Sequence, residues 1–559
     1  MPPIRLMTAA LAAALLLASS APAADWPQWG GTSGKNMASA EAGLPDTFDL
    51  GEKDPQGGGV RLETAKNITW AARIGAMTCS SPTVAGGRLF IGTMRNDRGF
   101  FLCLDEATGK ALWRWDAPCL DVPALIDGRA FKFGTYPKQL GVCSTAAVDG
   151  DAVYFVNHRL ELMCLGVSGK PRASAPAAVA EAKDAPATPA AKKDAAKKPA
   201  AKSEREWWPE APAEADVRWS FDIYATGVRP SDAVNCSPVV DENYVYVLTA
   251  NGVDRLADAR KHDEERKVPA PDAPNVMVFD KRTGRLVAVD DVRFPERMLH
   301  GQWSSPALGK VGGKTHIYFG GGDGLCYAFE APAAPAATPA PGDKPAILKK
   351  VWWADCNPKE YQAAVGDRPL FLHYCLGDKR RADALNKPDK GTFVGMSEIV
   401  ATPVFHKDRV YVAIGRDPAH GRGRGALWCI DATKTGDVTE AGRVWCYQGL
   451  DRSLSTASIA DGLVYVADVA GRIHCLDADT GKVFWVHENN TQTWGSTLVA
   501  DGKVFLGTEK GLWILAAGRE YKALGKINIG APVWATPVAA NGVLYVASKT
   551  YLYAVQKRP

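Results

Sequence analysis

The chain has 559 residues, of which 46% are hydrophobic and 23% are charged, an ordinary composition for a globular protein. The formal net charge of +4 at pH 7 is small for this length and gives no reason to expect a nucleic-acid partner. Short β-strand signals recur throughout and no long run of helical periodicity occurs, so the sequence excludes a helical bundle and predicts an all-β fold.

Residues 1–24 have the three parts of a secretory signal peptide. Arg5 precedes an apolar run from Leu6 to Leu17, and small residues follow up to Ala24. The apolar run is too short to span a bilayer, and we expect no transmembrane segment elsewhere. No cysteine lies near the expected cleavage site after Ala23 or Ala24, so no lipid anchor is expected. The sequence therefore predicts a protein that is exported to the periplasm or secreted.

A short pattern recurs eight times along residues 25–559. It consists of a hydroxyl residue, a proline or small residue and an apolar pair, and a strand of the Val-Tyr-Val kind follows it. We call the hydroxyl residue the anchor. Neighbouring anchors are at least 40 residues apart, and a repeated four-stranded unit of that length is typical of a β-propeller blade. The sequence predicts an eight-bladed β-propeller of four-stranded antiparallel blades, with anchors at Ser81, Thr145, Ser237, Ser305, Thr402, Thr456, Ser496 and Thr536.

The sixth repeat shows the blade in its plainest form. Asp477, Thr480 and Gly481 predict a tight turn between its third and fourth strands, because Asp and Thr hydrogen-bond their own backbone and Gly accepts positive φ. The last repeat ends one strand short at residues 550–555. We expect residues 67–70, which precede the first repeat, to supply the missing outer strand, close the ring and remove the open sheet edges.

Two stretches rich in alanine and proline interrupt the second and fourth repeats at matching places. Residues 171–206, which also carry many lysines, and residues 331–345 cannot bury enough apolar surface to offset the entropy of ordering them. We expect both to be disordered insertions in one propeller domain rather than linkers between domains. The blades should resume with fourth strands at residues 217–221 and 351–353.

Longer connections at residues 115–142, 250–275 and 355–398 are predicted to form a binding face, because binding residues concentrate on loops of rigid scaffolds. Cys356 and Cys375 lie in the last of these and are candidates for a disulfide. Cys79, Cys119 and Cys143 form another possible group, whose pairing the sequence does not give. Five further cysteines share one position in the third strand, where we expect small buried residues: Cys103, Cys164, Cys326, Cys429 and Cys475.

The residue two positions before each anchor should lie at the start of an innermost strand, around the central channel. These eight residues, which we call the mouth ring, include three tryptophans, and indole rings could stack on a flat aromatic ligand together with Asn235. The alternative, which we favour, is that large side chains simply fill the channel. The mouth ring consists of Cys79, Cys143, Asn235, Trp303, Val400, Leu454, Trp494 and Trp534.

The phrase LDADTGKVFW at residues 476–485 and the recurring Ser-Pro and Val-Tyr-Val pattern resemble the PQQ-like β-propeller repeat. This repeat is named after quinoprotein alcohol dehydrogenases and also builds BamB-type outer-membrane assembly factors. Residues 25–31, DWPQWGG, resemble the start of a group of secreted PQQ-like propeller proteins. The resemblance spans roughly residues 25–559 and implies the propeller fold; it leaves the function open, because a shared fold does not fix chemistry.

The resemblance implies two functions, and the aromatic residues of the long loops suggest a third. The first, which we favour, is a monomeric, non-catalytic binding or scaffold protein whose loop face holds another protein or an envelope polymer. The second is a dehydrogenase of alcohols or sugars that uses PQQ and Ca²⁺, and the third is a carbohydrate-binding propeller. In the dehydrogenases two adjacent cysteines form a ring over the cofactor, but this chain has no Cys-Cys pair and no haem-attachment motif. Asn235 with Asp232 or Asp241 is too common a grouping to identify calcium ligands, and no metal site is predicted.

Overall fold

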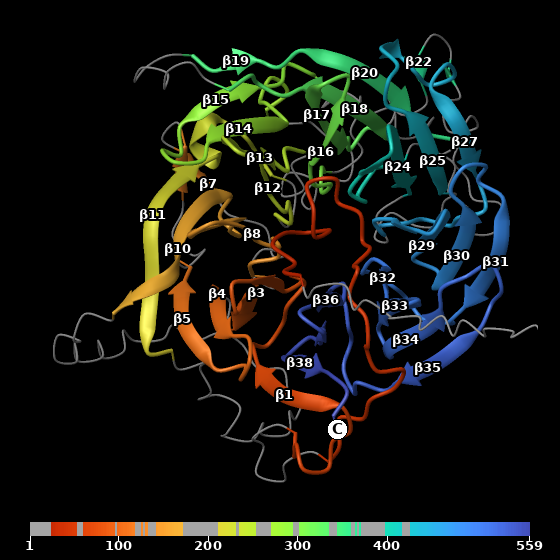
Figure 1. Ribbon diagram of the computed structural model, residues 1–559. Coiled ribbons are helices and arrows are strands. Elements are labelled where there is room, and N and C mark those ends of the chain that lie inside the picture. Colours follow the sequence, from red (N-terminus) through yellow and green to blue (C-terminus); the bar gives the residue numbers. More distant parts are fainter. Residues whose placement is uncertain are drawn as a thin grey trace, which may run out of the picture.

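A computed structural model shows the strands arranged as a ring of antiparallel sheets around a central axis (Figure 1). Side chains are described for residues 24–52, 60–95, 98–117, 141–171, 211–230, 234–252, 270–293, 301–334, 344–358, 397–415 and 425–558, and backbone alone for the four short strands of two isolated hairpins. Within these residues the strands form eight four-stranded antiparallel units, each following one anchor. The all-β propeller class is confirmed, whereas the count of eight blades for the whole chain stays a prediction.

The first four blades carry the longest insertions. Blade 1 consists of β2 (Thr83–Ala85), β3 (Arg88–Arg95), β4 (Arg98–Asp105) and β5 (Ala111–Asp116). Blade 2 consists of β8 (Ala147–Asp149), β9 (Ala152–Val156), β10 (Glu161–Pro171) and β11 (Ala213–Asp222). Blade 3 consists of β12 (Val239–Val240), β13 (Tyr244–Leu248), β14 (Val276–Asp280) and β15 (Leu286–Val289). Blade 4 consists of β16 (Ala307–Val311), β17 (Lys314–Gly320), β18 (Leu325–Glu330) and β20 (Lys350–Asp355).

The last four blades are more regular. Blade 5 consists of β23 (Val404–His406), β24 (Arg409–Ile414), β25 (Ala426–Asp431) and β27 (Arg443–Tyr447). Blade 6 consists of β28 (Ser458–Ala460), β29 (Leu463–Ala467), β30 (Arg472–Asp477) and β31 (Val483–Glu488). Blade 7 consists of β32 (Leu498–Ala500), β33 (Lys503–Thr508), β34 (Gly511–Ala516) and β35 (Ala523–Ile527). Blade 8 consists of β36 (Val538–Ala540), β37 (Val543–Ala547), β38 (Tyr551–Val555) and β1 (Ile68–Arg73).

Short additional elements decorate this ring. Parallel pairing of β5 with β11 joins blades 1 and 2, while β19 (Ala346–Ile347) and β26 (Gly436–Asp437) extend blades 3 and 4. Two separate hairpins are formed by β6 (Ala124–Ile126) with β7 (Arg129–Phe131) and by β21 (Ala364–Val365) with β22 (Arg368–Pro369). One 3₁₀ turn, η2, covers Tyr224–Thr226.

The ring closes through β1, as the sequence predicts. Ile68 pairs with Val555 and Arg73 pairs with Tyr551, so a strand from before the first repeat completes the last blade. The predicted fourth strands of blades 2 and 4 also form, within β11 and β20. Most of the two predicted disordered insertions, residues 172–206 and 335–343, lies outside the described residues; Pro171 itself is the last residue of β10.

Tryptophans fasten five of the eight described blades to the next blade. The indole Nε1 of Trp485 in blade 6 donates to Gly518 O of blade 7 at 2.9 Å, and Trp445 in blade 5 donates to Ala478 O of blade 6 at 3.1 Å. The turn glycine of the receiving blade lies flat on that indole: a Cβ at Gly481 would be 2.7 Å from the Trp445 ring. Gly481 therefore serves both the positive φ of its turn and the packing between blades. The same indole-to-carbonyl bond is made by Trp70, Trp113 and Trp219.

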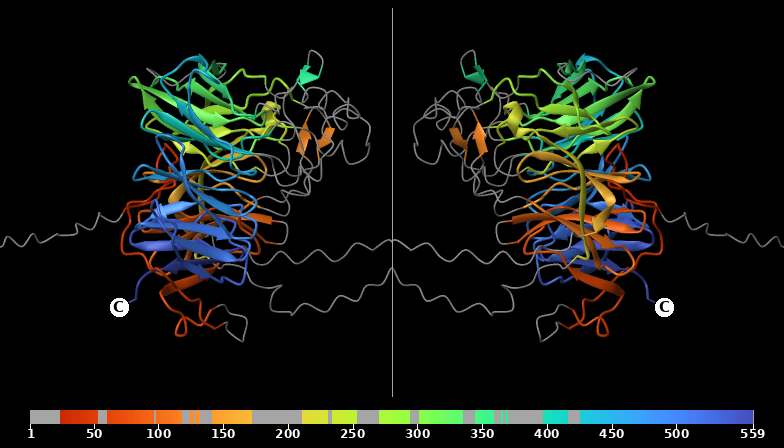
Figure 2. Two further views of the ribbon diagram at one scale, coloured as in Figure 1. Left: turned by 90° about the vertical axis from the view of Figure 1, so that its right-hand side faces the viewer. Right: turned by 90° about the vertical axis from the view of Figure 1, so that its left-hand side faces the viewer.

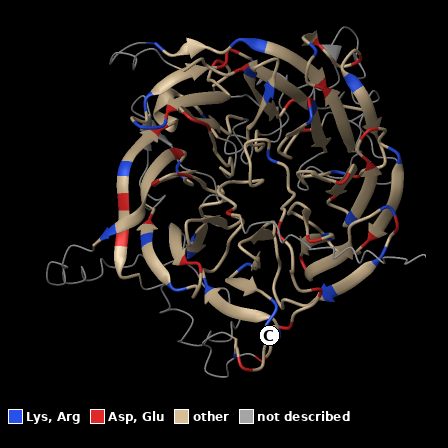
Figure 3. Ribbon diagram, in the orientation of Figure 1, with Lys and Arg blue, Asp and Glu red and all other residues tan. Residues whose placement is uncertain are grey.

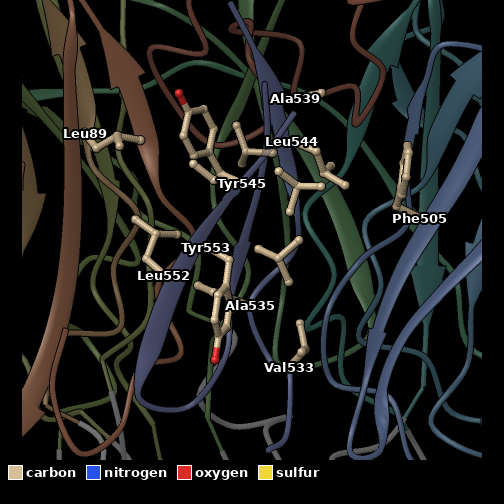
Figure 4. Close-up of a cluster of buried hydrophobic side chains, with 14 of the residues drawn as sticks. Leu89, Phe505, Val533, Ala535, Ala539, Leu544, Tyr545, Leu552 and Tyr553 are labelled. Carbon is tan, nitrogen blue, oxygen red and sulfur yellow. The ribbon is translucent and has the colours of Figure 1, made fainter. Parts of the chain in front are cut away.

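The hydrophobic core lies between the blades rather than along the axis. In Figure 4, Leu544, Tyr545 and Tyr553 of blade 8 share one cluster with Leu89 of blade 1 and Phe505 of blade 7. Side chains from both faces of each sheet are buried in this way, so each blade is stabilised by its two neighbours.

Candidate functional site

The N-terminal segment, residues 24–41, crosses one end of the propeller axis; it is the red trace through the centre of Figure 1. Its backbone and side chains make hydrogen bonds to the innermost strand, or to the residue just before it, in every blade. The partners are Val84, Val148, Pro238, Leu308, Phe405, Ile459, Val499 and Ala539, in chain order. We call the end that this segment covers the plugged face.

Asn36 shows how closely this segment matches the blades. Its Nδ2 donates to Ile459 O at 2.8 Å, and its Oδ1 accepts from Ile459 N at 2.8 Å. One side-chain amide thus makes both of the backbone hydrogen bonds that a paired strand would make to Ile459. Glu41 holds the end of the segment in a similar way. Its carboxylate accepts from Ala24 N at 2.8 Å and from Gly542 N at 2.6 Å.

Lys35 carries a charge into the interior of the ring. Its backbone lies between the contacts to blades 5 and 6, while its Nζ reaches Pro238 O of blade 3 at 3.2 Å and Gln28 Oε1 at 3.5 Å. The side chain therefore spans the axis and is fully buried. Burial lowers the pKa of Lys35 to about 7, because the charged form loses its hydration.

The anchors form a belt of hydrogen bonds around the axis. The backbone N–H of one anchor donates to the side-chain oxygen of the anchor in the next blade, as Thr145 does to Ser237 at 3.0 Å. Seven such links are recorded among the described residues, and the link from Thr536 to Ser81 closes the ring. Between blades 4 and 5, Ser304 Oγ donates instead to Ala401 O at 2.9 Å. This belt explains why every repeat has Ser or Thr at that position.

The connections predicted to form the binding face begin and end on the face opposite the plug, which we call the loop face. Antiparallel strands alternate in direction, so the second-to-third-strand turns and the connections between blades reach the same end of the ring. Figure 2 shows the hairpins β6–β7 and β21–β22 projecting from this face, with the C-terminus on the other side. Most of residues 118–140, 253–269 and 359–396 lies outside the described part of the chain.

The mouth ring lies at the loop face, one step above the anchor belt, but its tryptophans do not form a single group. Trp303 of blade 4 is buried, Trp534 of blade 8 is partly exposed, and Trp494 of blade 7 is 39% exposed. Trp494 and Trp534 come from adjacent blades, and Gly495 packs against Trp534 O. Trp303 instead neighbours Asn235 of blade 3, whose anchor binds the blade 4 anchor. The role of these four residues as a cofactor site stays a prediction.

Several buried polar atoms at this mouth have no hydrogen-bond partner among the residues that the structure describes. Gln302, which the sequence did not single out, is 1% exposed, and both its Oε1 and Nε2 are unpartnered. Its only sequence signal is that it precedes Trp303 in the repeat register. Buried polar groups need a partner, so these atoms are positions where water or a ligand would bind. The others are Asn235 Oδ1, Thr493 Oγ1, Trp534 Nε1 and both ring nitrogens of His158.

These groups could bind a planar quinone ring, and their amide oxygens alone do not make a calcium site. Amides and indoles can bond to or stack on neutral planar groups, whereas calcium prefers several carboxylate and carbonyl oxygens. The described residues contain no cluster of three His, Cys, Asp or Glu that could hold a metal. Asp241 cannot join Asn235, because it caps the first turn of blade 3 at the plugged face by accepting from Tyr244 N at 2.8 Å. Asp232 lies outside the described residues.

The cysteines divide into three environments. The five third-strand cysteines are buried, as expected. Cys356 is a buried free thiol close to Ala354 O at 3.6 Å, and its proposed partner Cys375 lies outside the described residues, so that pairing stays a prediction. Cys79 and Cys143 are not joined by a disulfide, and their side chains hydrogen-bond each other. Their proposed companion Cys119 lies outside the described residues.

The surface charge is mixed, and the described helices are not membrane spans. In Figure 3, lysine, arginine, aspartate and glutamate are interspersed around the ring, in agreement with the small net charge. Among the residues described, the structure contains no helix with the length and apolar character needed to cross a bilayer.

Comparisons with known proteins agree with this architecture. A family model described as outer membrane protein assembly factor BamB matches residues 60–193 and 424–534. A polyvinylalcohol dehydrogenase of Sphingopyxis sp. is 23% identical over 302 residues, which cover 51% of this chain and 39% of that protein. The BamB of Nitrosomonas eutropha is 34% identical over 86 residues, which cover 15% of this chain and 21% of that protein. The matches thus span well under half of these relatives.

Solved structures share the fold at low sequence identity. BamB from Moraxella catarrhalis has a TM-score of 0.50 at 11% identity, covering 88% of this chain and 99% of its own. A quinohemoprotein alcohol dehydrogenase from Pseudomonas putida HK5 has a TM-score of 0.54 at 12% identity, covering 96% and 81%. A europium-containing methanol dehydrogenase has a TM-score of 0.51 at 11% identity, covering 94% and 89%. The repeat motif, the partial family match and the fold agree in making this chain similar to the PQQ-like β-propeller repeat family.

Proposed function

We propose that the protein is an exported, non-catalytic binding protein of the cell envelope whose loop face holds another protein or an envelope polymer. The observation that carries this proposal is the difference between the two ends of the ring. Residues 24–41 cover the plugged face with contacts to each of the eight described blades, while the exposed indole of Trp494 and the hairpins β6–β7 and β21–β22 lie at the loop face (Figure 2). A rigid ring that presents its loops on one side is the arrangement of a binding scaffold. The similarity to BamB proteins supports the same role.

Photo-crosslinking in cells tests the predicted binding face. A benzoylphenylalanine at position 494, on the loop face, should give a discrete crosslinked species in cells that express the full chain. The matched position is Tyr521, which is 47% exposed and follows β34 at the plugged face. Crosslinks at position 521 but not at 494 would overturn the assignment of the binding face.

Export is part of this proposal, and Glu41 offers a specific test. Cleavage after Ala23 would convert the Ala24 nitrogen into a charged amine, which lies 2.8 Å from the Glu41 carboxylate. Such charge-assisted bonds are stronger than neutral ones. N-terminal sequencing of the protein from a periplasmic fraction should therefore begin at Ala24. A chain that keeps residues 1–23 and stays in the cytoplasm would contradict export.

A PQQ-dependent dehydrogenase is the second candidate, and the unpartnered atoms of Gln302 and Asn235 beside Trp303 favour it. Calorimetric titration with PQQ, with and without Ca²⁺, followed by a dye-linked oxidation assay on alcohols and sugars, separates the two proposals. The binding-protein proposal predicts no saturable heat and no dye reduction. Calcium-dependent binding with turnover would replace it, and Gln302→Leu should then weaken that binding while the plugged-face variant Tyr521→Leu should not.

A further inference from the structure

Cys79 and Cys143 occupy the same position in neighbouring blades. Each lies two residues before its anchor, and the chains on either side are fastened together. Ser80 Oγ donates to Ser144 O at 3.0 Å, and Ser81 N donates to Thr145 Oγ1 at 3.1 Å. These bonds place the two thiols side by side, and the thiols hydrogen-bond each other without a covalent link.

The two thiols differ in exposure. Cys79 is partly exposed at the mouth of the ring, whereas Cys143 in the neighbouring blade is buried at 6% exposure, with its Sγ 3.8 Å from Gly141 O. Lys549, from the β37–β38 turn of blade 8, adds positive charge near Cys79. Its Nζ lies 5.7 Å from the centre of the Trp534 ring, which fixes it at the same mouth. A thiol on a partly exposed residue near a cation, with a second thiol beside it, is an arrangement that suits thiol–disulfide exchange.

The protonation of the pair is correspondingly unequal. The hydrogen bond from Cys143, aided by Lys549, lowers the pKa of Cys79, and the same bond raises the pKa of Cys143. Burial raises the pKa of each of the other eight described cysteines, to about 11 for Cys164 and about 12 for Cys475. Those thiols are expected to be inert packing residues. Cys79 differs from all eight in the direction of its pKa shift, and from all but the partly exposed Cys446 in access.

We propose that Cys79 and Cys143 are a redox-active thiol pair that closes into a disulfide between blades 1 and 2 by exchange with a small-molecule disulfide. The Cys79 thiolate attacks one sulfur of the small disulfide, forms a mixed disulfide and releases one thiolate. Cys143 passes its proton to that thiolate and attacks the Cys79 sulfur, forming the Cys79–Cys143 bond and releasing the second thiolate, which takes up the proton lost by Cys79. The protein loses two electrons and two protons, and the small disulfide is reduced to two thiols.

The disulfide would tie together two blades that the anchor belt already joins, directly above the belt. Because it closes across neighbouring strands, it would change the chemistry of the mouth without rearranging the ring. Reduction would return a thiol pair beside Lys549 and Trp534. The pair would thus give the loop face two chemical states that depend on the surrounding thiol–disulfide balance.

The test uses the full chain in glutathione buffers of graded oxidised-to-reduced ratio. Samples are quenched with an alkylating reagent, digested and mapped by mass spectrometry. We expect a Cys79–Cys143 crosslinked peptide that appears with rising oxidised glutathione and disappears on reduction. Absence of this peptide across the whole range would overturn the proposal, and so would a crosslink from Cys79 to Cys119.

Two variants separate the roles of the thiols. Cys143→Ser should stop at a glutathione adduct on Cys79, whereas Cys79→Ser should leave Cys143 unmodified. Cys103→Ser, which removes a buried third-strand thiol of blade 1, is the matched control and should leave the crosslink intact. Lys549→Gln should slow alkylation of Cys79 by about two- to fivefold, the effect of removing one partly exposed charge. Adduct formation on Cys143 in Cys79→Ser would refute the assigned order of attack.

Discussion

Replacement of Lys35 by methionine should abolish one specific pH dependence of stability. The pKa of Lys35 falls from 10.5 to about 7 because its ammonium is buried. Each unit by which the pKa falls corresponds to about 1.4 kcal/mol. Keeping the charged form of Lys35 inside the ring therefore costs about 5 kcal/mol relative to the unfolded chain. Pro238 O and Gln28 Oε1 are neutral acceptors and offset this cost only in part.

The sign of the pH effect follows from proton binding. Between pH 7 and pH 10.5 the unfolded chain holds the lysine proton while the folded protein has released it, so folding becomes more favourable as pH rises through this window. Below pH 7 both states are protonated, and this group adds no further pH dependence. From pH 7.5 to pH 9.5 the free energy of unfolding of the wild type should therefore gain about 3 kcal/mol relative to Lys35→Met.

Urea unfolding followed by tryptophan fluorescence at several pH values measures this difference, with midpoint shifts converted at a common slope. Lys503→Met is the matched control, because it removes another buried ammonium of the same chain but one that is paired with Asp501 at 2.5 Å and Asp46 at 3.1 Å. The control should keep the wild-type rise between pH 7.5 and pH 9.5, since Lys35 is still present. Parallel pH profiles of wild type and Lys35→Met would refute the reasoning.

Three further predictions concern the contacts that hold the ring together. Ser237→Ala removes the acceptor of the buried Thr145 N–H and should lower the free energy of unfolding by about 1–3 kcal/mol in urea titrations. An unchanged midpoint would mean that this bond of the belt does not contribute to stability. Asn36→Ala loses both bonds to Ile459 and should expose the N-terminal segment to limited proteolysis at lower urea than in the wild type, whereas Asn36→Asp keeps the acceptor and should lie between them. Trp485→Phe loses the bond to Gly518 O and part of the buried ring, and should cost about 1–2 kcal/mol. Trp485→Ala empties the space between blades 6 and 7 and should cost about 3–5 kcal/mol; equal losses in thermal unfolding would contradict the packing role of the indole.

The features of the fold that depend on local spacing could be predicted from the sequence. The turn at Asp477 to Gly481, the strand that closes the ring at residues 67–70 and the resumed strands of blades 2 and 4 all follow from short patterns. A blade repeats every 40 residues or more, and each copy restates the same turn chemistry. A wrong assignment of strands or turns in one repeat can therefore be corrected by comparison with the other repeats.

The contacts that cross the axis could not be predicted in the same way. The DWPQWGG phrase marks the beginning of the plug, but its partners lie in eight different blades, and no local pattern indicates where such a segment runs. The anchor hydroxyls were visible as a repeated residue type, although their hydrogen bonds join residues 40 to 92 positions apart and, at the closure, 455 positions apart. The separation of Trp303 from the other two tryptophans could have been predicted from the sequence. Repeat order alone places Trp303 in blade 4 and Trp494 and Trp534 in blades 7 and 8.

Comparison of the eight repeats with one another separates packing from function within this single chain. The anchor position is Ser or Thr in every repeat, and seven of these eight side chains accept a backbone N–H in the belt. Two residues earlier, the mouth ring carries Cys, Cys, Asn, Trp, Val, Leu, Trp and Trp, so the fold imposes no common side chain there. Side chains that packing leaves unconstrained, placed at the end of the ring opposite the plug, are where an otherwise symmetric propeller can acquire a specific chemistry. The thiols, amides and indoles of the mouth ring are therefore the residues whose substitution should change binding while leaving the ring folded.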